Sequence, residues 1–263
     1  MSEYFLQELP YARDSSALLS CLATLPGLAF LDSGLGNTPH VRYDILSALP
    51  DLEILEDAGA VRLRAGDSES PYDGDVFAAV AEAMRQHAPD ANIVAPEALA
   101  TLPFKGGAIG CFGYERHSQI GIYSWAVVVD HQLARCWLFA LPGCSADTLR
   151  RVHEALQTPP HAPRQFRLEQ PFVSNFTAEA YKAAFDRIQD YIHAGDCYQV
   201  NLAQRFSARY EGDPLSAYLK LRQHIHSPFA AYLQREQDAV LSFSPERFIS
   251  VNDGAVLTQP IKG

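Results

Sequence analysis

The sequence contains few cysteines, and those present do not form a recognisable set. There are five among 263 residues, at positions 21, 111, 136, 144 and 197, with no Cys-x-x-Cys pair. The odd number and the spacing argue against a disulfide framework and against a zinc site, and they fit a reducing compartment. Cysteine usage therefore predicts a cytoplasmic protein.

Basic residues and long apolar runs are also scarce. Lysine and arginine together number 21 against 31 acidic residues, the formal net charge is −10, and no basic cluster interrupts this balance. Nucleic acid and anionic membranes are therefore not expected as partners. No apolar run approaches the roughly 20 residues that cross a bilayer. The N-terminus carries Glu3 and Glu8 and lacks the apolar core of a signal peptide.

The composition that remains is typical of a globular protein with a buried core, since 48% of residues are hydrophobic and 20% are charged. The clearest break is the proline-rich stretch Thr158-Pro-Pro-His-Ala-Pro163, whose prolines remove backbone donors. This stretch predicts an N-terminal region over residues 1–157, a linker over 158–170 and a second region over 171–263.

Apolar periodicity predicts mixed helices and strands in the first region. We expect helices over 15–25, from 75 to near 89, and over 145–156, and strands over 28–31, 41–46, 52–55, 60–64, 125–129 and 134–139. The segment Lys105–Tyr114 is predicted as a strand punctuated by glycines, but it lacks Gly-x-Gly-x-x-Gly spacing and no helix follows it. We interpret its glycines as sites of close backbone packing rather than as a phosphate cradle.

The second region begins with a strong helix signal, in which Thr177 caps an apolar stripe that ends at Gly195. A strand is expected over 196–206, with Gln199 and Asn201 projecting from the same face. A helix opens at Asp213-Pro214, and three strands follow over 229–233, 239–251 and 255–259. This order of elements predicts an α+β layered fold.

Two charged residues near the C-terminus stand where reacting groups are common. Lys262 follows a predicted strand and precedes Gly263, and a lysine becomes a nucleophile if its pKa is depressed. Glu246 follows Pro245, which interrupts a strand ladder, so Glu246 is expected at a kink or an edge. Taken separately, each residue is better explained as a solvated surface charge, because most charged side chains lie on the surface.

Three motifs together point to one family. Gly195-Asp-Cys-Tyr-Gln-Val-Asn-Leu, Ser244-Pro-Glu-Arg-Phe-Ile and Pro260-Ile-Lys-Gly occur in this order. With them, the chain resembles component I of aminodeoxychorismate synthase over nearly its whole length, and the large subunit of anthranilate synthase more distantly. The resemblance implies a layered α/β/β/α sandwich with two antiparallel sheets of the chorismate-utilising type, incomplete at the C-terminus of this chain.

Two positions separate the branches of that superfamily. Isochorismate and salicylate synthases have a lysine where this chain has Gln199, and anthranilate synthases have Pro-Ile-Ala-Gly where this chain has Pro-Ile-Lys-Gly. Gln199 together with Lys262 is the aminodeoxychorismate pattern. The difference is chemical, because it decides which group attacks carbon 2 of chorismate.

The resemblance also implies a mechanism with a covalent intermediate. Lys262 adds to carbon 2 of chorismate as the carbon 4 hydroxyl departs, and ammonia then adds at carbon 4 and expels the lysine. Glu246 matches the general acid/base that protonates the leaving hydroxyl, and Gln199 matches a residue that orients the substrate. Mg2+ is the expected cofactor, with its carboxylate ligands beyond Gly263 and none in this chain.

A tryptophan site in the N-terminal half is implied as well. The matching positions are Ser33, His40, Val41, Arg42, Tyr43, Pro228, Phe229 and Ala230. Asp32, before the serine, matches an acidic residue expected to contact the ligand amine. The loop between Ser33 and Arg42 carries Gly34 and Gly36 and is variable, so occupied and empty sites remain two alternatives.

Members of this family continue well past the position of Gly263, so we expect the chain alone to be inactive and assign the reaction to a longer protein. The expected partner is a glutamine amidotransferase, component II, which supplies ammonia in the para-aminobenzoate branch of folate synthesis. Two alternatives stay open. One is an anthranilate synthase-like component, and the other is a non-catalytic module that binds tryptophan or docks the amidotransferase.

Overall fold

The computed structural model describes residues 3–36, 41–88, 93 and 95–261. The chain forms two compact units: a larger unit of residues 1–162 with 218–263, and a smaller unit of residues 163–217. The larger unit includes residues from both ends of the chain, because Phe229–Gln234 and Ala239–Ser244 join the sheet of the N-terminal strands. No helix among the described residues is long and apolar enough to span a membrane.

The larger unit contains a seven-stranded antiparallel sheet. Its order is β1 (Phe5–Leu9), β10 (Arg135–Ala140), β9 (Trp125–Asp130), β3 (Tyr43–Ser47), β2 (Ala29–Asp32), β15 (Phe229–Gln234) and β16 (Ala239–Ser244). Strand β2 lies between β3 and β15, so that Phe30 pairs with Leu46 on one side and with Tyr232 on the other. Strand β9, between β10 and β3, is buried along its whole length, as a central strand covered on both faces should be.

A second antiparallel sheet has five strands. Its order is β6 (Ser68–Tyr72), β5 (Ala60–Ala65), β4 (Leu52–Asp57), β8 (His117–Tyr123) and β7 (Gly107–Cys111). A Cβ atom on Gly110 of β7 would lie 2.3 Å from the carbonyl oxygen of Gln119, and one on Gly106 would lie 2.4 Å from Leu141 Cδ1. The prediction that these glycines permit close packing is therefore confirmed.

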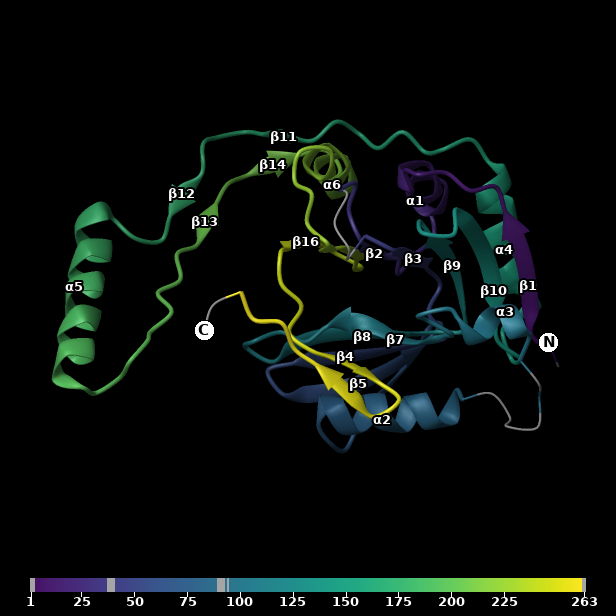
Figure 1. Ribbon diagram of the computed structural model, residues 1–263, viewed down its shortest axis with the longest axis horizontal. Helices are drawn as coiled ribbons and strands as arrows, with labels where there is room; N and C mark the ends of the chain where they lie inside the picture. Colours follow the sequence, from purple (N-terminus) through teal and green to yellow (C-terminus); the bar gives the residue numbers. More distant parts are fainter. Residues whose placement is uncertain (1–2, 37–40, 89–92, 94, 262–263) are drawn as a thin grey trace. The chain divides into compact units, whose positions relative to one another are not determined.

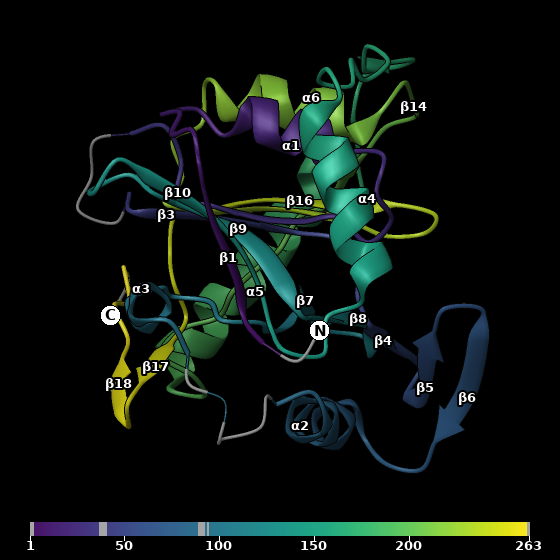
Figure 2. The ribbon, with the colours of Figure 1, turned by 90° about the vertical axis from the view of Figure 1, so that its right-hand side faces the viewer.

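Helices cover the outer faces of the two sheets in the larger unit. Helix α1 (Ser16–Leu22) packs against α4 (Ala146–Gln157) outside the seven-stranded sheet, and α2 (Val76–Gln86) packs on β4, β7 and β8 (Figures 1 and 2). A short helix, α3 (Glu97–Ala100), contributes Leu99 to the core between the sheets. The larger unit is therefore an α/β/β/α sandwich, which confirms the expected fold class.

The smaller unit consists of two short strand pairs and one long helix. Strand β11 (Arg167–Leu168) pairs with β14 (Tyr210–Glu211), and β12 (Val173–Ser174) pairs with β13 (Phe206–Ser207). Helix α5 (Ala178–Ala194) begins where Thr177 Oγ1 accepts from Ala180 N over 3.1 Å, and it ends at Gly195 with φ +82°. Both ends of this helix confirm the sequence prediction.

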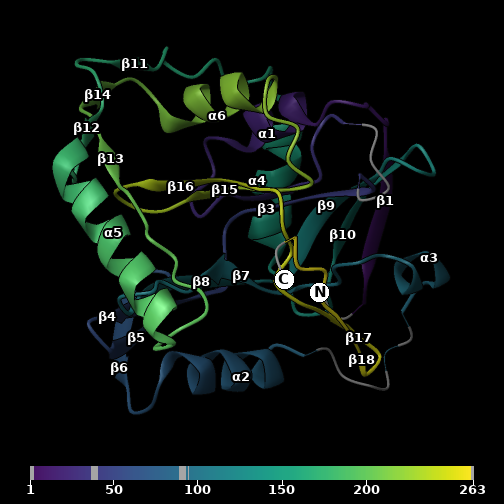
Figure 3. The ribbon, with the colours of Figure 1, turned by 60° about the vertical axis from the view of Figure 1, so that its left-hand side comes forward.

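The strand predicted over 196–206 is wrong. Residues 196–205 run back alongside α5 without strand structure, and only Phe206–Ser207 pair with another strand (Figure 3). A strand needs a neighbour to accept and donate its ladder hydrogen bonds, and the smaller unit offers one only at its end, where Asn175 N donates to Arg205 O. The alternation of Gln199 and Asn201 therefore does not place their side chains on a sheet face.

The C-terminal strands are shorter than expected. Strand β16 ends at Ser244, directly before Pro245, which cannot donate to the ladder. The chain then forms a hairpin of β17 (Ser250–Asn252) and β18 (Ala255–Leu257), in place of one strand over 239–251 and another over 255–259. Helix α6 (Pro214–Arg222) precedes β15 and brings Tyr218 and Arg222 into the larger unit.

Candidate functional site

A buried ion pair lies where β2 meets the last turn of α6. Asp32 Oδ2 accepts from Arg222 Nε over 2.6 Å and from Tyr218 OH over 2.8 Å. Asp32 Oδ1 accepts from Gly34 N over 2.8 Å and from Arg222 Nη2 over 3.2 Å. Protein donors therefore engage both carboxylate oxygens of Asp32, and its expected contact with a ligand amine stays a prediction.

The charge of Arg222 is stabilised by several carboxylates. Burial alone would lower the pKa of Arg222, but hydrogen bonding to Asp32 and the negative charges of Asp32, Asp44 and Asp14 raise it. The same environment raises the pKa of Tyr218, first through burial and then through the charge of Asp32. Tyr218 is therefore a neutral hydrogen-bond donor in this site.

Asp44 forms a second centre beside the first. Its Oδ1 accepts from the backbone N–H and the hydroxyl of Ser33, each over 2.9 Å. Its Oδ2 accepts from Ser15 Oγ over 2.6 Å and lies 3.0 Å from His131 Nε2. Burial would raise the pKa of Asp44, but these hydrogen bonds and the charge of His131 outweigh it and lower the pKa.

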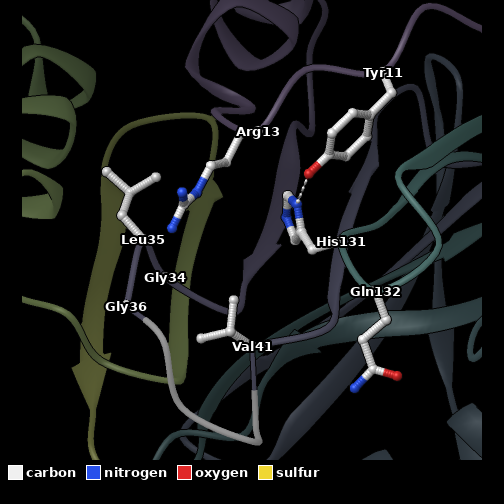
Figure 4. Close-up of a pocket in the computed structure, with 8 residues that line it drawn as sticks. All are labelled: Tyr11, Arg13, Gly34, Leu35, Gly36, Val41, His131 and Gln132. Carbon is white, nitrogen blue, oxygen red and sulfur yellow. Dashed lines mark hydrogen bonds between the residues drawn. The ribbon is translucent and has the colours of Figure 1, made fainter.

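His131 connects this centre to a surface cavity of about 460 Å³ (Figure 4). Its Nδ1 lies 3.3 Å from Tyr11 OH, and the two side chains point toward one another in Figure 4. The Asp44 carboxylate accepts a hydrogen bond from Nε2–H of His131, and the Tyr11 hydroxyl lies at the other ring nitrogen. The cavity is lined by Tyr11, Arg13, Gly34, Leu35, Gly36, Val41, His131 and Gln132.

The structure gathers most of the residues expected to bind tryptophan around the ends of β2, β3 and β15. Ser33 is buried against Asp44, and Val41 lines the cavity. Arg42 pairs with Asp130 over 3.3 Å and stacks on Tyr43, 4.6 Å from the ring centroid, with its Nε buried and without a hydrogen-bond partner among the described residues.

The second group of expected tryptophan ligands comes from β15. Ala230 pairs with Asp32 across the sheet, and Phe229 pairs with Ser244 and carries Arg247 over its ring at 5.2 Å. Pro228, half-buried, directly precedes this strand. His40 lies outside the described residues. The expected positions on β2 and β15 are thus neighbours in one sheet, although the sequence separates them by almost 200 positions.

The residues expected to act on chorismate lie in both units, Glu246 in the larger and Gln199 in the smaller. Glu246 is exposed, and its Oε1 accepts from Ile261 N over 3.2 Å. Ser244 Oγ holds the turn around Pro245 by donating to Glu246 O over 2.7 Å. Lys262, which follows Ile261, lies outside the described residues. Gln199 is exposed in the smaller unit, in the segment over 196–205 that was predicted as a strand.

Sequence reasoning missed the residues that organise the buried centre. Arg222, Asp44, His131 and Tyr11 come from α6, β3, the turn after β9 and the segment after β1, and no motif spacing connects them. A charged residue within an otherwise apolar stretch was the one available signal. Asp44 gives this signal, since it stands among Tyr43, Ile45 and Leu46.

Comparison with known proteins provides independent information. The profile of a family described as chorismate binding enzyme matches residues 53–263. Aminodeoxychorismate synthase component 1 of Klebsiella aerogenes is 36% identical over 97% of this chain and 59% of its own length, and that of Escherichia coli K12 is 35% identical over 93% and 56%. Anthranilate synthase component 1 of Neisseria gonorrhoeae is 27% identical over 92% and 55%.

Solved structures agree on the fold. Anthranilate synthase component I from Streptococcus pneumoniae superposes with a TM-score of 0.66 at 23% identity, covering 84% of this chain and 54% of that one. The menaquinone-specific isochorismate synthase of Escherichia coli gives a TM-score of 0.51 at 11% identity, covering 95% and 52%. The chain thus spans between half and three fifths of the length of these relatives.

Proposed function

Because the chain belongs to the family of chorismate binding enzymes, we propose that it forms part of the chorismate-acting component of an aminodeoxychorismate synthase. The observation that carries the proposal is the higher identity to component 1 of that enzyme, 36% and 35%, than to the gonococcal anthranilate synthase component, 27%. Lys262 in the Pro-Ile-Lys-Gly step supports the same branch. The reaction is proposed for the whole protein, since the chain covers 59% and 56% of the length of these relatives.

The proposed reaction is a double substitution on the chorismate ring. The neutral amine of Lys262 forms a bond to carbon 2, the ring double bonds shift, and the carbon 4 hydroxyl leaves with a proton as water. Ammonia then bonds to carbon 4, the double bonds shift back, and the lysine leaves carbon 2. Chorismate and ammonia thus give 4-amino-4-deoxychorismate and water, with no change of oxidation state.

Glu246 is the proposed proton donor to the leaving hydroxyl. The hydrogen bond from Ile261 N to its carboxylate supports this role, because it joins Glu246 to the main chain one residue before Lys262. Lys262 must lose its proton before it attacks, so a depressed lysine pKa is part of the proposal. Gln199 is proposed to orient the substrate through its amide.

Mg2+ is the expected cofactor of the reaction. Among the described residues, no group of three or more His, Cys, Asp or Glu side chains is arranged to hold a metal ion. No step of the proposed reaction is therefore assigned to a metal held by these residues.

The name component 1 of the relatives indicates a second component. We propose that this partner is a glutamine amidotransferase that supplies ammonia, and that the product serves para-aminobenzoate and folate synthesis in the cytoplasm. Free ammonium at high concentration should replace the partner in an assay, since ammonia is the nucleophile of the second substitution.

The test compares the chain alone with a fusion that adds the C-terminal segment of the Escherichia coli relative. Both are incubated with chorismate, Mg2+ and ammonium, and products are identified by mass spectrometry. We expect aminodeoxychorismate from the fusion, none from the chain alone, and loss of product in Lys262→Ala. Anthranilate as the product of an active fusion would instead support the anthranilate synthase alternative.

We further propose that the residues around the ends of β2, β3 and β15 bind tryptophan. The buried, unpartnered Nε of Arg42 and the hydroxyl of Ser33 support a site for a polar group, and Tyr43 and Phe229 supply aromatic surface. The purified chain is denatured and its extract analysed for tryptophan. An extract without tryptophan, and no binding of added tryptophan by the folded chain, would overturn the proposal.

A further inference from the structure

A second cavity, of about 540 Å³, lies in the larger unit and shares no lining residue with the first. Four segments border it: the end of α2, the start of β7, the corner between β8 and β9, and the turn after β10. Asp51, directly before β4, completes its wall. The polar side chains on this wall are Asp51, Gln86, His87, Lys105, Tyr123 and Ser124.

Two polar atoms on this wall are buried without a hydrogen-bond partner among the described residues. They are Asp51 Oδ2 and Ser124 Oγ. Their backbones are fixed, because Asp51 N donates to Ile122 O over 2.8 Å and Ser124 O accepts from Leu141 N over 2.7 Å. A buried acceptor without a donor costs free energy, so a ligand that brings a donor is stabilised there.

The charge of the Asp51 carboxyl determines which kind of hydrogen-bond donor binds beside it. Burial raises the pKa of Asp51, although the hydroxyl and the backbone N–H of Ser124 and the charge of His87 lower it. An ammonium group donates hydrogen bonds and carries a positive charge. Both stabilise the charged carboxylate and so offset the free-energy cost of its burial. An anion at the same place would be repelled by Asp51.

A positively charged side chain, that of Lys105, lies on the same wall of the cavity as Asp51. Lys105 lines the cavity and forms no ion pair with a described carboxylate. His87 is less available to a ligand than Lys105, because its Nδ1 already lies 2.9 Å from Ala83 O at the end of α2. The cavity is also lined by the apolar residues Met84, Leu141 and Pro142.

The backbone beside Lys105 is held by close contacts. Gly106 has φ +88°, and a Cβ atom there would lie 2.4 Å from Leu141 Cδ1; one on Gly107, with φ +134°, would lie 3.0 Å from Met84 Cε. These contacts leave no room for side chains, and they fix the position of the wall from which Lys105 extends.

We propose that this cavity binds a small zwitterion, with its ammonium group at Asp51 and Ser124 and its carboxylate at Lys105. The occupant is an ω-amino acid or a compound of the same chemistry, with a short apolar body between the two charges. The site is separate from the residues proposed to bind chorismate and tryptophan, so it stands or falls independently of them.

The test uses the 263-residue chain and three probes: 6-aminohexanoate, n-butylammonium and butyrate. Binding is followed by calorimetry and by amide chemical shifts in NMR spectra. We expect 6-aminohexanoate to bind most tightly, with shifts at Asp51, Lys105 and Ser124. Asp51→Asn should weaken 6-aminohexanoate and n-butylammonium by about tenfold or more, as loss of a charge-assisted hydrogen bond does. Lys105→Met should weaken 6-aminohexanoate and leave n-butylammonium unchanged.

Two controls keep the result interpretable. Asp73→Asn removes an exposed carboxylate outside the cavity and should change no affinity, and Ser124→Ala provides a second cavity variant that keeps the charge of Asp51. Circular dichroism confirms that each variant is folded. If no probe binds at millimolar concentration, or if Asp51→Asn binds n-butylammonium as tightly as the unaltered chain does, the proposal is overturned.

Discussion

The backbone N–H of Ile261 donates a hydrogen bond to Glu246 Oε1 over 3.2 Å. This contact joins the Ser244-Pro-Glu motif to the Pro260-Ile-Lys motif. The first lies within the strand predicted over 239–251, and the second follows the strand predicted over 255–259. One carboxylate oxygen of Glu246 thus accepts from the main chain, while the side chain as a whole remains exposed.

The first prediction concerns the proton transfer assigned to Glu246. Glu246→Gln keeps an oxygen that can accept from Ile261 but removes the transferable proton. In the active fusion we expect turnover to fall by about a hundredfold or more, with the thermal midpoint unchanged. The matched control is Glu115→Gln, at an exposed position, which should retain full turnover. Equal turnover in the unaltered fusion and Glu246→Gln would exclude Glu246 as the acid.

The second prediction concerns the buried pair of Arg222 and Asp32. Arg222→Met leaves Asp32 and Asp44 buried without their cation, and we expect a loss of about 3–5 kcal/mol of unfolding free energy. The control Arg150→Met breaks an exposed pair with Glu154 and should cost less than about 1 kcal/mol. Urea denaturation of the chain measures both, and similar losses for the two variants would contradict the prediction.

The third prediction follows from the lowered pKa of Asp44. A carboxyl whose pKa is lower in the folded state stabilises the fold above its unfolded pKa, about 3.9. That stability is lost as the pH falls through the folded pKa. The unaltered chain should therefore lose stability on acidification below about pH 4, and Asp44→Asn should show a flatter dependence. Parallel urea midpoints for the two proteins from pH 6 to pH 3 would contradict it.

The fourth prediction is that Asp51 makes the stability depend on pH in the opposite direction, because burial raises the pKa of Asp51. Between the unfolded pKa and the higher folded pKa the folded state binds more protons, so stability falls as the pH rises through this window. Other titratable groups near Asp51 are His87, Lys105, Tyr123 and Cys144. The difference between the unaltered chain and Asp51→Asn isolates its contribution: Asp51→Asn should gain relative stability as the pH rises. A constant difference would refute it.

The fifth prediction tests the close packing of β7 against β8. In Gly110→Ala the added Cβ meets backbone atoms, 2.3 Å from Gln119 O and 2.5 Å from Ile120 Cα. These atoms cannot move without disturbing the strand pairing, so we expect a loss of about 1–3 kcal/mol or more. Gly66→Asn is the control, since nothing lies within 4 Å of its Cβ position and asparagine tolerates φ +58°. Urea denaturation should show little change for it.

Much of the fold could be predicted from the sequence because its signals are local. Asp75 caps α2 by accepting from Ala78 N over 2.8 Å, and Ser145 caps α4 by accepting from Thr148 N over 2.9 Å. The apolar run from Trp125 to Val129 gives the fully buried β9. These features depend on residues within a few positions of one another, where helix capping and side-chain periodicity operate.

The failures have a different cause. The alternation of apolar and polar residues over 196–206 matches the pattern of a strand. A strand also requires a neighbouring strand to pair with, and the alternation within one segment does not identify that neighbour. The sequence by itself determined the longer helices, most strands of the two large sheets and the family motifs, but not helix α3. Only the tertiary structure decided that Arg222 meets Asp32, 190 positions away, because burying a cation requires carboxylates around it and the sheet alone brings them there.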